Sequence, residues 1–139
     1  MTEGYNPFSL SGKTVLVVGA SSGIGRSIAI EASVIGAEVI ACARNIERLE
    51  QLCVEMGNGN HSYIVGDITI PDDLQRIIDE VPALDGLVLS AGKGLTLPFQ
   101  FCTNDKFEDV FRVNFFSQVE LLRLLLKNKK FKPNASVVI

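Results

Sequence analysis

The sequence has no tryptophan, one histidine and three cysteines in 139 residues. The cysteines, Cys42, Cys53 and Cys102, are too few and too scattered for a disulfide framework, and none forms a C-x-x-C pair. A structural zinc site needs about four Cys or His ligands at short spacing, so no metal site is expected. His61 follows a G-N-G-N turn and is expected at the surface. Unpaired thiols favour a reducing compartment, and we expect a cytoplasmic protein.

Long apolar runs and excess positive charge are missing as well. No run reaches the roughly 18 residues of a membrane span, and residues 1–12 lack the basic start and apolar stretch of a secretory signal. The net charge of −3 argues against nucleic acid or an anionic membrane as the main partner. The hydrophobic fraction of 47% excludes disorder, and the length of 139 residues predicts one domain over residues 1–139.

Short apolar runs alternate with longer helical patterns along the chain. Strands are expected at 14–18, 38–43, 63–65, 87–89 and 136–139, and helices at 24–35, 46–56, 71–81 and about 105–127. Asn45 is expected to cap the second helix, and Pro71 fits the first turn of the third. This alternation predicts the α/β class, with a doubly wound parallel sheet and helices on both faces. Such sheets bind ligands at the carboxyl ends of their strands.

Three glycines follow the first expected strand, in the segment G-A-S-S-G-I-G at 19–25. Glycine lets the backbone turn sharply and approach a pyrophosphate, and the next helix offers free N–H groups. An ordinary strand-to-helix loop is the alternative, but three glycines at this spacing favour dinucleotide binding. The candidate cofactor-binding residues of this segment are Gly19, Ser21, Ser22, Gly23, Ile24 and Gly25.

The second expected strand ends in Ala43-Arg44-Asn45. An NAD-binding protein usually carries Asp or Glu here, which accepts hydrogen bonds from the ribose hydroxyls. Arg44 could instead pair bidentately with a 2′-phosphate, so Arg44 and Asn45 are candidate contacts of NADP(H). The alternative for Arg44 is a solvated arginine at the start of a helix.

The segment V-V-G-A-S-S-G-I-G at 17–25 resembles the opening motif of the short-chain dehydrogenase/reductase family, and three matches follow in the family's order. Asp67-Ile68 resembles the acidic–apolar pair that contacts adenine, S-A-G at 90–92 resembles N-A-G, and Asn114 resembles the asparagine of the catalytic tetrad. The resemblance implies a Rossmann-type sheet of five strands in the order 3-2-1-4-5. It adds Asp67, Ile68, Ser90, Ala91, Gly92 and Val113 as cofactor contacts and Asn114 as the catalytic candidate. A local turn is the alternative for Asp67.

Two positions depart from the family pattern, with Val18 in place of threonine and Ser90 in place of asparagine. We expect the Ser90 hydroxyl to bond to the backbone of the first strand and restore one link between the strands. Asn114 lies within an expected helix that is apolar nearly all round, although a solvent-facing asparagine is the alternative. In the family this helix packs on the sheet and on a second subunit, which implies a homo-oligomer.

The family's Tyr-x-x-x-Lys motif does not occur, since Tyr5 and Tyr63 are followed four residues later by Ser9 and Asp67. The family's catalytic serine follows strand five, and the sequence ends within that expected strand. We therefore expect the front of an NADP(H)-dependent oxidoreductase, truncated at strand five and inactive alone. The intact protein would reduce a small carbonyl or oxidise an alcohol, as 3-oxoacyl-acyl-carrier-protein reductases do on carrier-linked substrates. A non-catalytic dinucleotide-binding module or a subunit of a split protein is the alternative. Another Rossmann-like class, such as a methyltransferase, fits less well because Arg44 stands where those enzymes usually carry a ribose-binding acid.

Overall fold

Five parallel strands form a single sheet in the order β3-β2-β1-β4-β5 in the computed structural model, which describes residues 4–139. The strands are β1 (Thr14–Val18), β2 (Glu38–Ala43), β3 (Ser62–Val65), β4 (Leu84–Leu89) and β5 (Phe131–Val138). The central strand β1 pairs with β2 on one side and with β4 on the other. The predicted α/β class, parallel pairing and strand order are confirmed.

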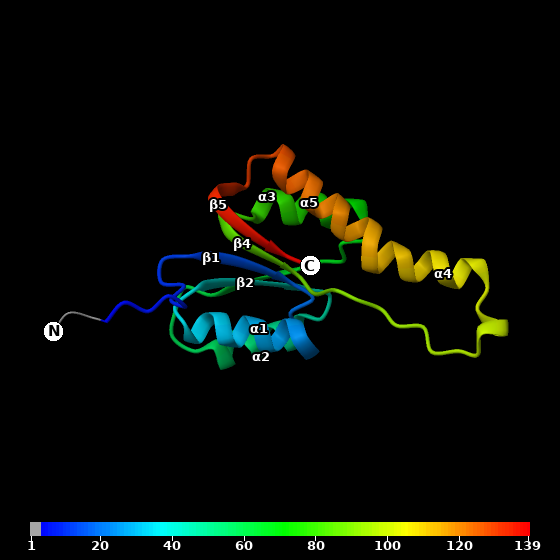
Figure 1. Cartoon of the computed structure of the whole chain (residues 1–139), viewed down its shortest axis with the longest axis horizontal. Coiled ribbons are helices and arrows are strands. Elements are labelled where there is room, and N and C mark those ends of the chain that lie inside the picture. Colours follow the sequence, from blue (N-terminus) through cyan, green and yellow to red (C-terminus); the bar gives the residue numbers. More distant parts are fainter. Residues whose placement is uncertain (1–3) are drawn as a thin grey trace.

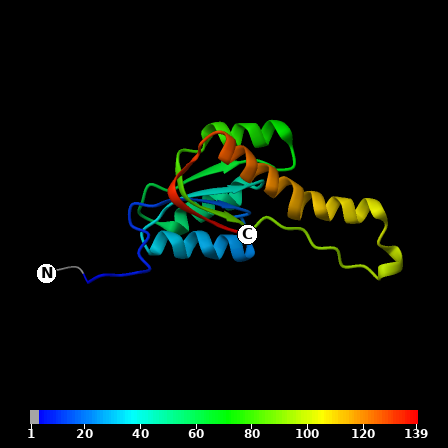
Figure 2. The same cartoon turned by 45° about the horizontal axis from the view of Figure 1, so that its top comes forward.

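Helices cover both faces of this sheet (Figures 1 and 2). One face carries α1 (Gly23–Val34) and α2 (Ile46–Met56), and the other carries α3 (Pro71–Glu80) and α5 (Ser117–Lys127). A short 3₁₀ turn, η1 (Phe99–Phe101), precedes α4 (Asn104–Phe111), and a π-helical turn, η2 (Arg112–Phe116), joins α4 to α5. The Asn45 cap of α2 is confirmed, because its Oδ1 accepts the Arg48 N–H at 2.9 Å.

The apolar run of β1 serves both faces at once. Successive side chains of a strand point to opposite sides, so Val17 packs in the cluster that contains Leu49 of α2, while Leu16 packs with Leu121 of α5. All four side chains are fully buried. Burial of each such aliphatic side chain contributes about 1.5–3 kcal/mol. This two-sided core fixes the sheet, and therefore the positions of the loops that leave its carboxyl edge.

The last two strands are longer than their apolar runs predict, since β4 begins at Leu84 and β5 begins at Phe131. Leu84 pairs with Phe131, and the register then shifts before pairing resumes at Gly86 and Ser136. Within the described sheet β5 is an edge strand. Pro133 lacks an N–H group, and an edge strand tolerates this because its outer side has no strand to pair with.

The single helix expected at about 105–127 is interrupted, which corrects the sequence expectation. At the π-helical turn the Ser117 N–H bonds to the carbonyl of Arg112, five residues back. The Ser117 hydroxyl donates to the same Arg112 carbonyl and, at 3.2 Å, to the Val113 carbonyl. The Ser117 hydroxyl thus adds a side-chain donor to the carbonyls of the turn, and such turns are frequent at functional sites.

His61 is half-buried, contrary to its expected surface position. Its Nδ1 accepts the N–H of Val39 at 3.1 Å, so the imidazole supplies an acceptor just before the β2–β3 ladder begins at Ile40 and Ser62. Across residues 4–139, no helix combines the length and the apolar character that crossing a bilayer requires.

Candidate functional site

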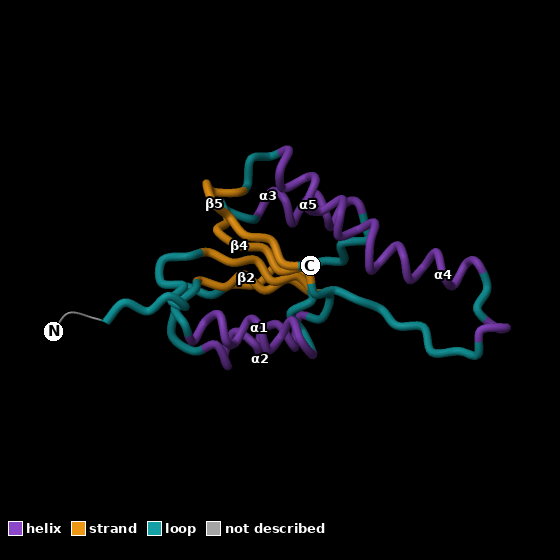
Figure 3. The backbone as a smooth tube through the Cα atoms, in the orientation of Figure 1, coloured by secondary structure: helices purple, strands orange, loops and turns teal. Residues whose placement is uncertain are grey.

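A cavity of about 590 Å³ lies at the carboxyl ends of β1, β2, β3 and β4. Parallel strands end at the same edge, so residues far apart in sequence meet here (Figure 3). Twelve of the fifteen candidate residues line the cavity: Gly19, Ser21, Ser22, Gly23, Ile24, Arg44, Asp67, Ile68, Ser90, Ala91, Gly92 and Val113. The other three, Gly25, Asn45 and Asn114, lie outside its wall and act on neighbouring residues.

The glycines of the first loop have different roles. Gly19 has a φ of +82°, and a Cβ there would lie 2.5 Å from the backbone N of Ala91. A Cβ at Gly25 would lie 2.3 Å from the Gly19 carbonyl oxygen. These two glycines thus allow the loop, α1 and the end of β4 to pack together, while Gly23 at φ +56° has open space around it.

The N-terminus of α1 faces the same cavity. Ser22 occupies the N-cap position without a side-chain cap, and the first turn contains no acidic residue. The first N–H groups of a helix have no partner within the helix, and the helix dipole places partial positive charge there. This terminus can therefore accept a phosphate group.

Arg44 lines the cavity at the end of β2 and is exposed. Within residues 4–139 its guanidinium has no recorded ion pair or hydrogen bond, so all its donors remain open to a ligand. No acidic side chain stands at positions 43–45. Asn45 has its side chain engaged at the first turn of α2, so its recorded contact is a helix cap rather than the cavity.

Asp67 combines its place in the cavity wall with a local turn. Its Oδ1 accepts the Thr69 N–H at 2.9 Å and the Thr69 hydroxyl at 2.6 Å. The Asp67 N–H donates to Oδ2 of Asp73 at 2.9 Å, and this bond, followed by that from Arg76, lowers the pKa of Asp73. The two sequence interpretations of Asp67 are thus compatible, because the turn orients a carboxylate that also borders the cavity.

Ser90 bonds to β1 through its backbone and not through its side chain. Its N–H donates to the Val18 carbonyl at 2.9 Å. No hydrogen bond of the Ser90 hydroxyl is recorded among the described residues, so the expected side-chain link is wrong. The ladder between β1 and β4 already joins the strands here, and the hydroxyl remains at the cavity wall.

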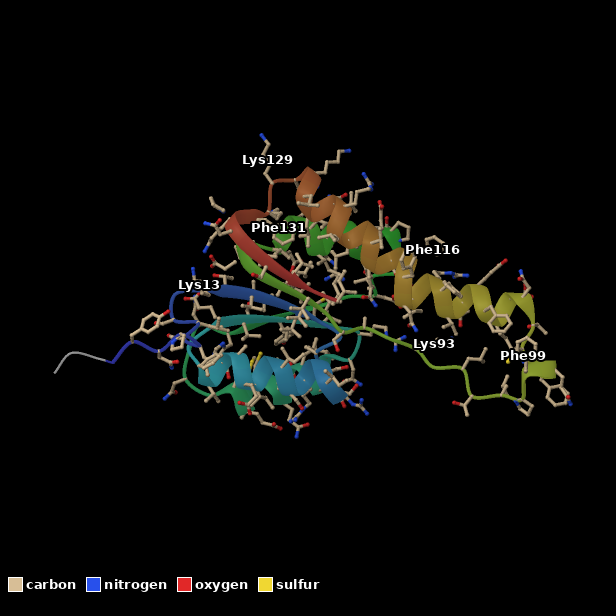
Figure 4. All side chains as sticks on the ribbon, viewed as in Figure 1. Lys13, Lys93, Phe99, Phe116, Lys129 and Phe131 are labelled. Carbon is tan, nitrogen blue, oxygen red and sulfur yellow. The ribbon has the colours of Figure 1, made fainter. Side chains whose placement is uncertain are left out.

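Asn114 lies beside the cavity and holds its wall. Its Oδ1 accepts the N–H of Lys93 at 2.7 Å, and its Nδ2 donates to the carbonyl of Lys93 at 2.9 Å. The side chain of Lys93 pairs with Asp109, one helical turn before Asn114, and this ion pair lowers the pKa of Asp109. Figure 4 shows Lys93 at the start of the loop that leaves the sheet after β4, and Phe99 at the far end of that loop, near α4.

The sequence placed Lys93 near the expected cofactor edge without a role, and sequence reasoning missed Thr69, Asp109 and Gln118. Lys93, Asp109 and Thr69 line the cavity, and Gln118 donates a hydrogen bond to the carbonyl of Ala91 in the cavity wall. Each is an ordinary surface or helix residue by type and spacing. The one available signal was the position of Lys93 directly after S-A-G, where the strand-end loop continues.

The cavity contains no acid–base tyrosine. Tyr5 lies in the N-terminal arm, and Tyr63 lies on β3 with its hydroxyl donating to Glu50 at 3.2 Å. Cys42 borders the cavity, but burial raises the pKa of its thiol to about 12, so it is not a nucleophile near neutral pH. Over residues 4–139, no three His, Cys, Asp or Glu side chains group as metal ligands. The geometry suits an extended anionic ligand, and no tyrosine of the described residues lines the cavity.

Comparisons with known proteins agree with this geometry. The family model described as short chain dehydrogenase matches residues 13–139. The chain is 30% identical over 146 residues to hydroxysteroid 11-beta-dehydrogenase 1-like protein A of Xenopus laevis, with 99% of this chain and 50% of the relative covered. It is 33% identical over 119 residues to the NADPH-dependent 1-acyldihydroxyacetone phosphate reductase of Saccharomyces cerevisiae, covering 81% of this chain and 40% of that protein.

Solved structures give the same result. L-sorbose reductase from Gluconobacter frateurii, complexed with NADPH and L-sorbose, is similar with a TM-score of 0.78 and 25% identity, covering 86% of this chain and 48% of that one. The 3-ketoacyl-(acyl-carrier-protein) reductase from Brucella melitensis, complexed with NADH, gives 0.79 and 26%, covering 86% and 51%. The chain spans about half the length of the relatives it matches. With its family model matched from residue 13 to residue 139, the chain belongs to the short-chain dehydrogenase family.

Proposed function

We propose that this chain forms the cofactor-binding front of an NADP(H)-dependent oxidoreductase that reduces a carbonyl by hydride transfer. The observation that carries the proposal is the pairing of two features in one cavity. The uncapped N-terminus of α1 provides a phosphate site, and Arg44 provides an unpaired cation at the end of β2. The bound nicotinamide would supply the hydride.

The residues present fit such a cofactor. The pyrophosphate would lie against the Gly23 turn, where a φ of +56° and open space leave the backbone accessible. Asp67 and Ile68 would border the adenine, and Ser90 to Gly92 would border a ribose. The cavity thus presents polar groups where charge is expected and an apolar side chain where a base would stack.

The choice of NADP(H) over NAD(H) depends on Arg44. A guanidinium can form two charge-assisted hydrogen bonds with a 2′-phosphate, and positions 43–45 carry no acid in place of the usual ribose-binding carboxylate. Relatives differ on this point, since L-sorbose reductase was solved with NADPH and the Brucella melitensis reductase with NADH. Titration of the chain with NADPH and NADH, followed by nicotinamide fluorescence, tests the proposal. Tighter binding of NADPH supports it, and equal or weaker binding of NADPH contradicts it.

The substrate of the intact protein is proposed as a small carbonyl compound or its alcohol, including acyl-carrier-linked ones. A putative betaketoacyl-ACP reductase is among the similar structures, with a TM-score of 0.77. Curated relatives carry hydroxysteroid dehydrogenase and acyldihydroxyacetone phosphate reductase names. These names share reduction of a carbonyl or oxidation of an alcohol, so we propose the reaction class rather than one substrate. The cytoplasm remains our proposed compartment, because all three thiols are free.

A non-catalytic binding module is the second candidate. The observation that favours it is that no tyrosine of residues 4–139 lines the cavity. The two candidates agree on cofactor binding. They differ on whether a longer form of the chain, carrying a serine and a Tyr-x-x-x-Lys segment, reduces a carbonyl with NADPH.

We also propose that the intact protein associates with a second copy through the helical segment around Asn114. Phe111, Phe115, Phe116 and Val119 are exposed on this segment, with 62% of Phe116 accessible. Contiguous exposed apolar surface of this kind marks association sites. Light scattering on the 139-residue chain tests this proposal, and a monodisperse monomer would contradict it.

A further inference from the structure

We propose that Gln118 is a positioning residue of the cofactor site, whose buried amide holds the Ala91 peptide that forms the cavity wall. The inference rests on the proposed function for its link to NADPH, but its structural part concerns this chain alone. Gln118 lies in the first turn of α5, and only 5% of it is exposed. Burying a polar amide costs free energy unless the amide is hydrogen-bonded, so its partners indicate its purpose.

Two carbonyl groups face the Gln118 amide nitrogen. Nε2 donates to the Ala91 carbonyl and also lies 3.4 Å from the Val113 carbonyl. Because both partners are acceptors, the orientation of the amide is determined by its surroundings. Ala91 is part of the S-A-G loop after β4, and Val113 lies in the π-helical turn, so one side chain ties the loop to the turn.

The Ala91 peptide is confined on its other side by the glycine loop. The backbone N of Ala91 lies so near Gly19 that a Cβ at residue 19 would approach it to 2.5 Å. Ala91 is therefore contacted on both sides, with its carbonyl oxygen bonded to Gln118 and its backbone nitrogen close to Gly19. A shift of Ala91 would move the wall between Gly19 and Gly92, both of which line the cavity.

The same connection reaches Asn114 and Lys93. Asn114 follows Val113 in the π-helical turn and holds both backbone groups of Lys93, two residues after Ala91. Gln118 thus supports the turn from one end and the loop from the other. A glutamine fits this role because it donates two hydrogen bonds and carries no charge that would need a counter-ion.

The test compares Gln118→Met, which keeps the volume and removes the hydrogen bonds, with the unchanged 139-residue chain. One readout is the protection factor of the Lys93 amide in hydrogen exchange without cofactor, and the other is the dissociation constant for NADPH. We expect about fivefold lower protection and about fivefold weaker binding, as for loss of one buried hydrogen bond. Gln75→Met is the matched control, because the Gln75 amide bonds to Asp79 at 2.9 Å on the exposed side of α3 and should leave both values unchanged.

A second variant guards against a folding failure of the first. Gln118→Glu keeps the shape but faces both carbonyls with acceptor oxygens when ionised and regains a donor when protonated. We expect its Lys93 protection factor to recover toward that of the unchanged chain between pH 8 and pH 5, a dependence that a merely space-filling role would not produce.

Three outcomes decide the proposal. Protection factor and NADPH affinity within twofold of the unchanged chain in Gln118→Met would overturn it. Weaker binding with unaltered Lys93 protection would also overturn it, since Gln118 would then act by another route. Reduced protection in a chain that binds no NADPH, substituted or not, would support the positioning role and reject the proposed function.

Discussion

The carboxylate of Asp85 accepts the backbone N–H of Thr14 at 2.9 Å. The bond joins the first residue of β1 to the second residue of β4 at the amino edge of the sheet, opposite the cavity. Lys132 of β5 also donates to Asp85 at 3.0 Å. One side chain therefore links β1, β4 and β5 at the point where the pairing of β4 with β5 shifts register.

This arrangement predicts a loss of stability in acid. The Thr14 N–H, then Lys132, lower the pKa of Asp85 in the folded chain, so the folded state prefers the ionised carboxylate. Its stabilisation is present above the unfolded pKa of about 4 and is lost as pH falls through the lower folded value. Urea unfolding between pH 6 and pH 3 should show a shallower decline for Asp85→Asn than for the unchanged chain. Identical slopes would contradict the assignment.

Replacing Arg44 should change the cofactor preference. Arg44→Asp removes the cation proposed to pair with the 2′-phosphate and introduces an acceptor for ribose hydroxyls. A hydrogen bond to a charged group contributes about 1.5–3 kcal/mol, so we expect NADPH binding to weaken by roughly 10- to 100-fold relative to NADH. Fluorescence titration with both cofactors measures the ratio.

Arg48→Asp is the matched control for that experiment. Arg48 is exposed on α2, one turn further along, and does not line the cavity. It carries the same change of charge and should leave the NADPH-to-NADH ratio unaltered. A ratio that moves equally in both variants would show a general charge effect and would refute a specific role for Arg44.

The substitution Gly25→Ala should disturb the packing of the Gly19 loop against α1. Its Cβ would meet the Gly19 carbonyl oxygen at 2.3 Å, so either the loop or α1 must move. Overpacking of this kind costs about 1–3 kcal/mol, measurable as a lower free energy of unfolding, and should weaken NADPH binding. Gly94→Ala, which has nothing within 4 Å, should behave like the unchanged chain. Equal stability of both variants would mean that the close approach is not required.

The 139-residue chain should not reduce carbonyl compounds. No tyrosine lines the cavity, and loss of a general acid typically removes a factor of about 10²–10⁴ in rate. We expect no NADPH oxidation above background with small ketones, measured by absorbance with purified protein. A turnover that survives repurification would refute this prediction.

Much of the fold was predictable from local pattern. The continuous apolar run of β1 indicated a strand buried on both faces, and strand–helix alternation predicted parallel pairing. The end of each element was less predictable. β4 and β5 begin earlier than their apolar runs because Leu84 pairs with Phe131, a contact between distant segments that no local pattern shows.

The sequence by itself determined which residues are candidates for dinucleotide binding, because glycine spacing and the arginine at position 44 express local chemistry. Only the tertiary structure decided how the wall of the site is held. Two sets of hydrogen bonds join the helical segment to the loop after β4. Asn114 of the π-helical turn η2 bonds to Lys93, and Gln118 of α5 bonds to Ala91. These contacts span 21 to 27 residues in sequence and arise because packing on the sheet brings the two segments together.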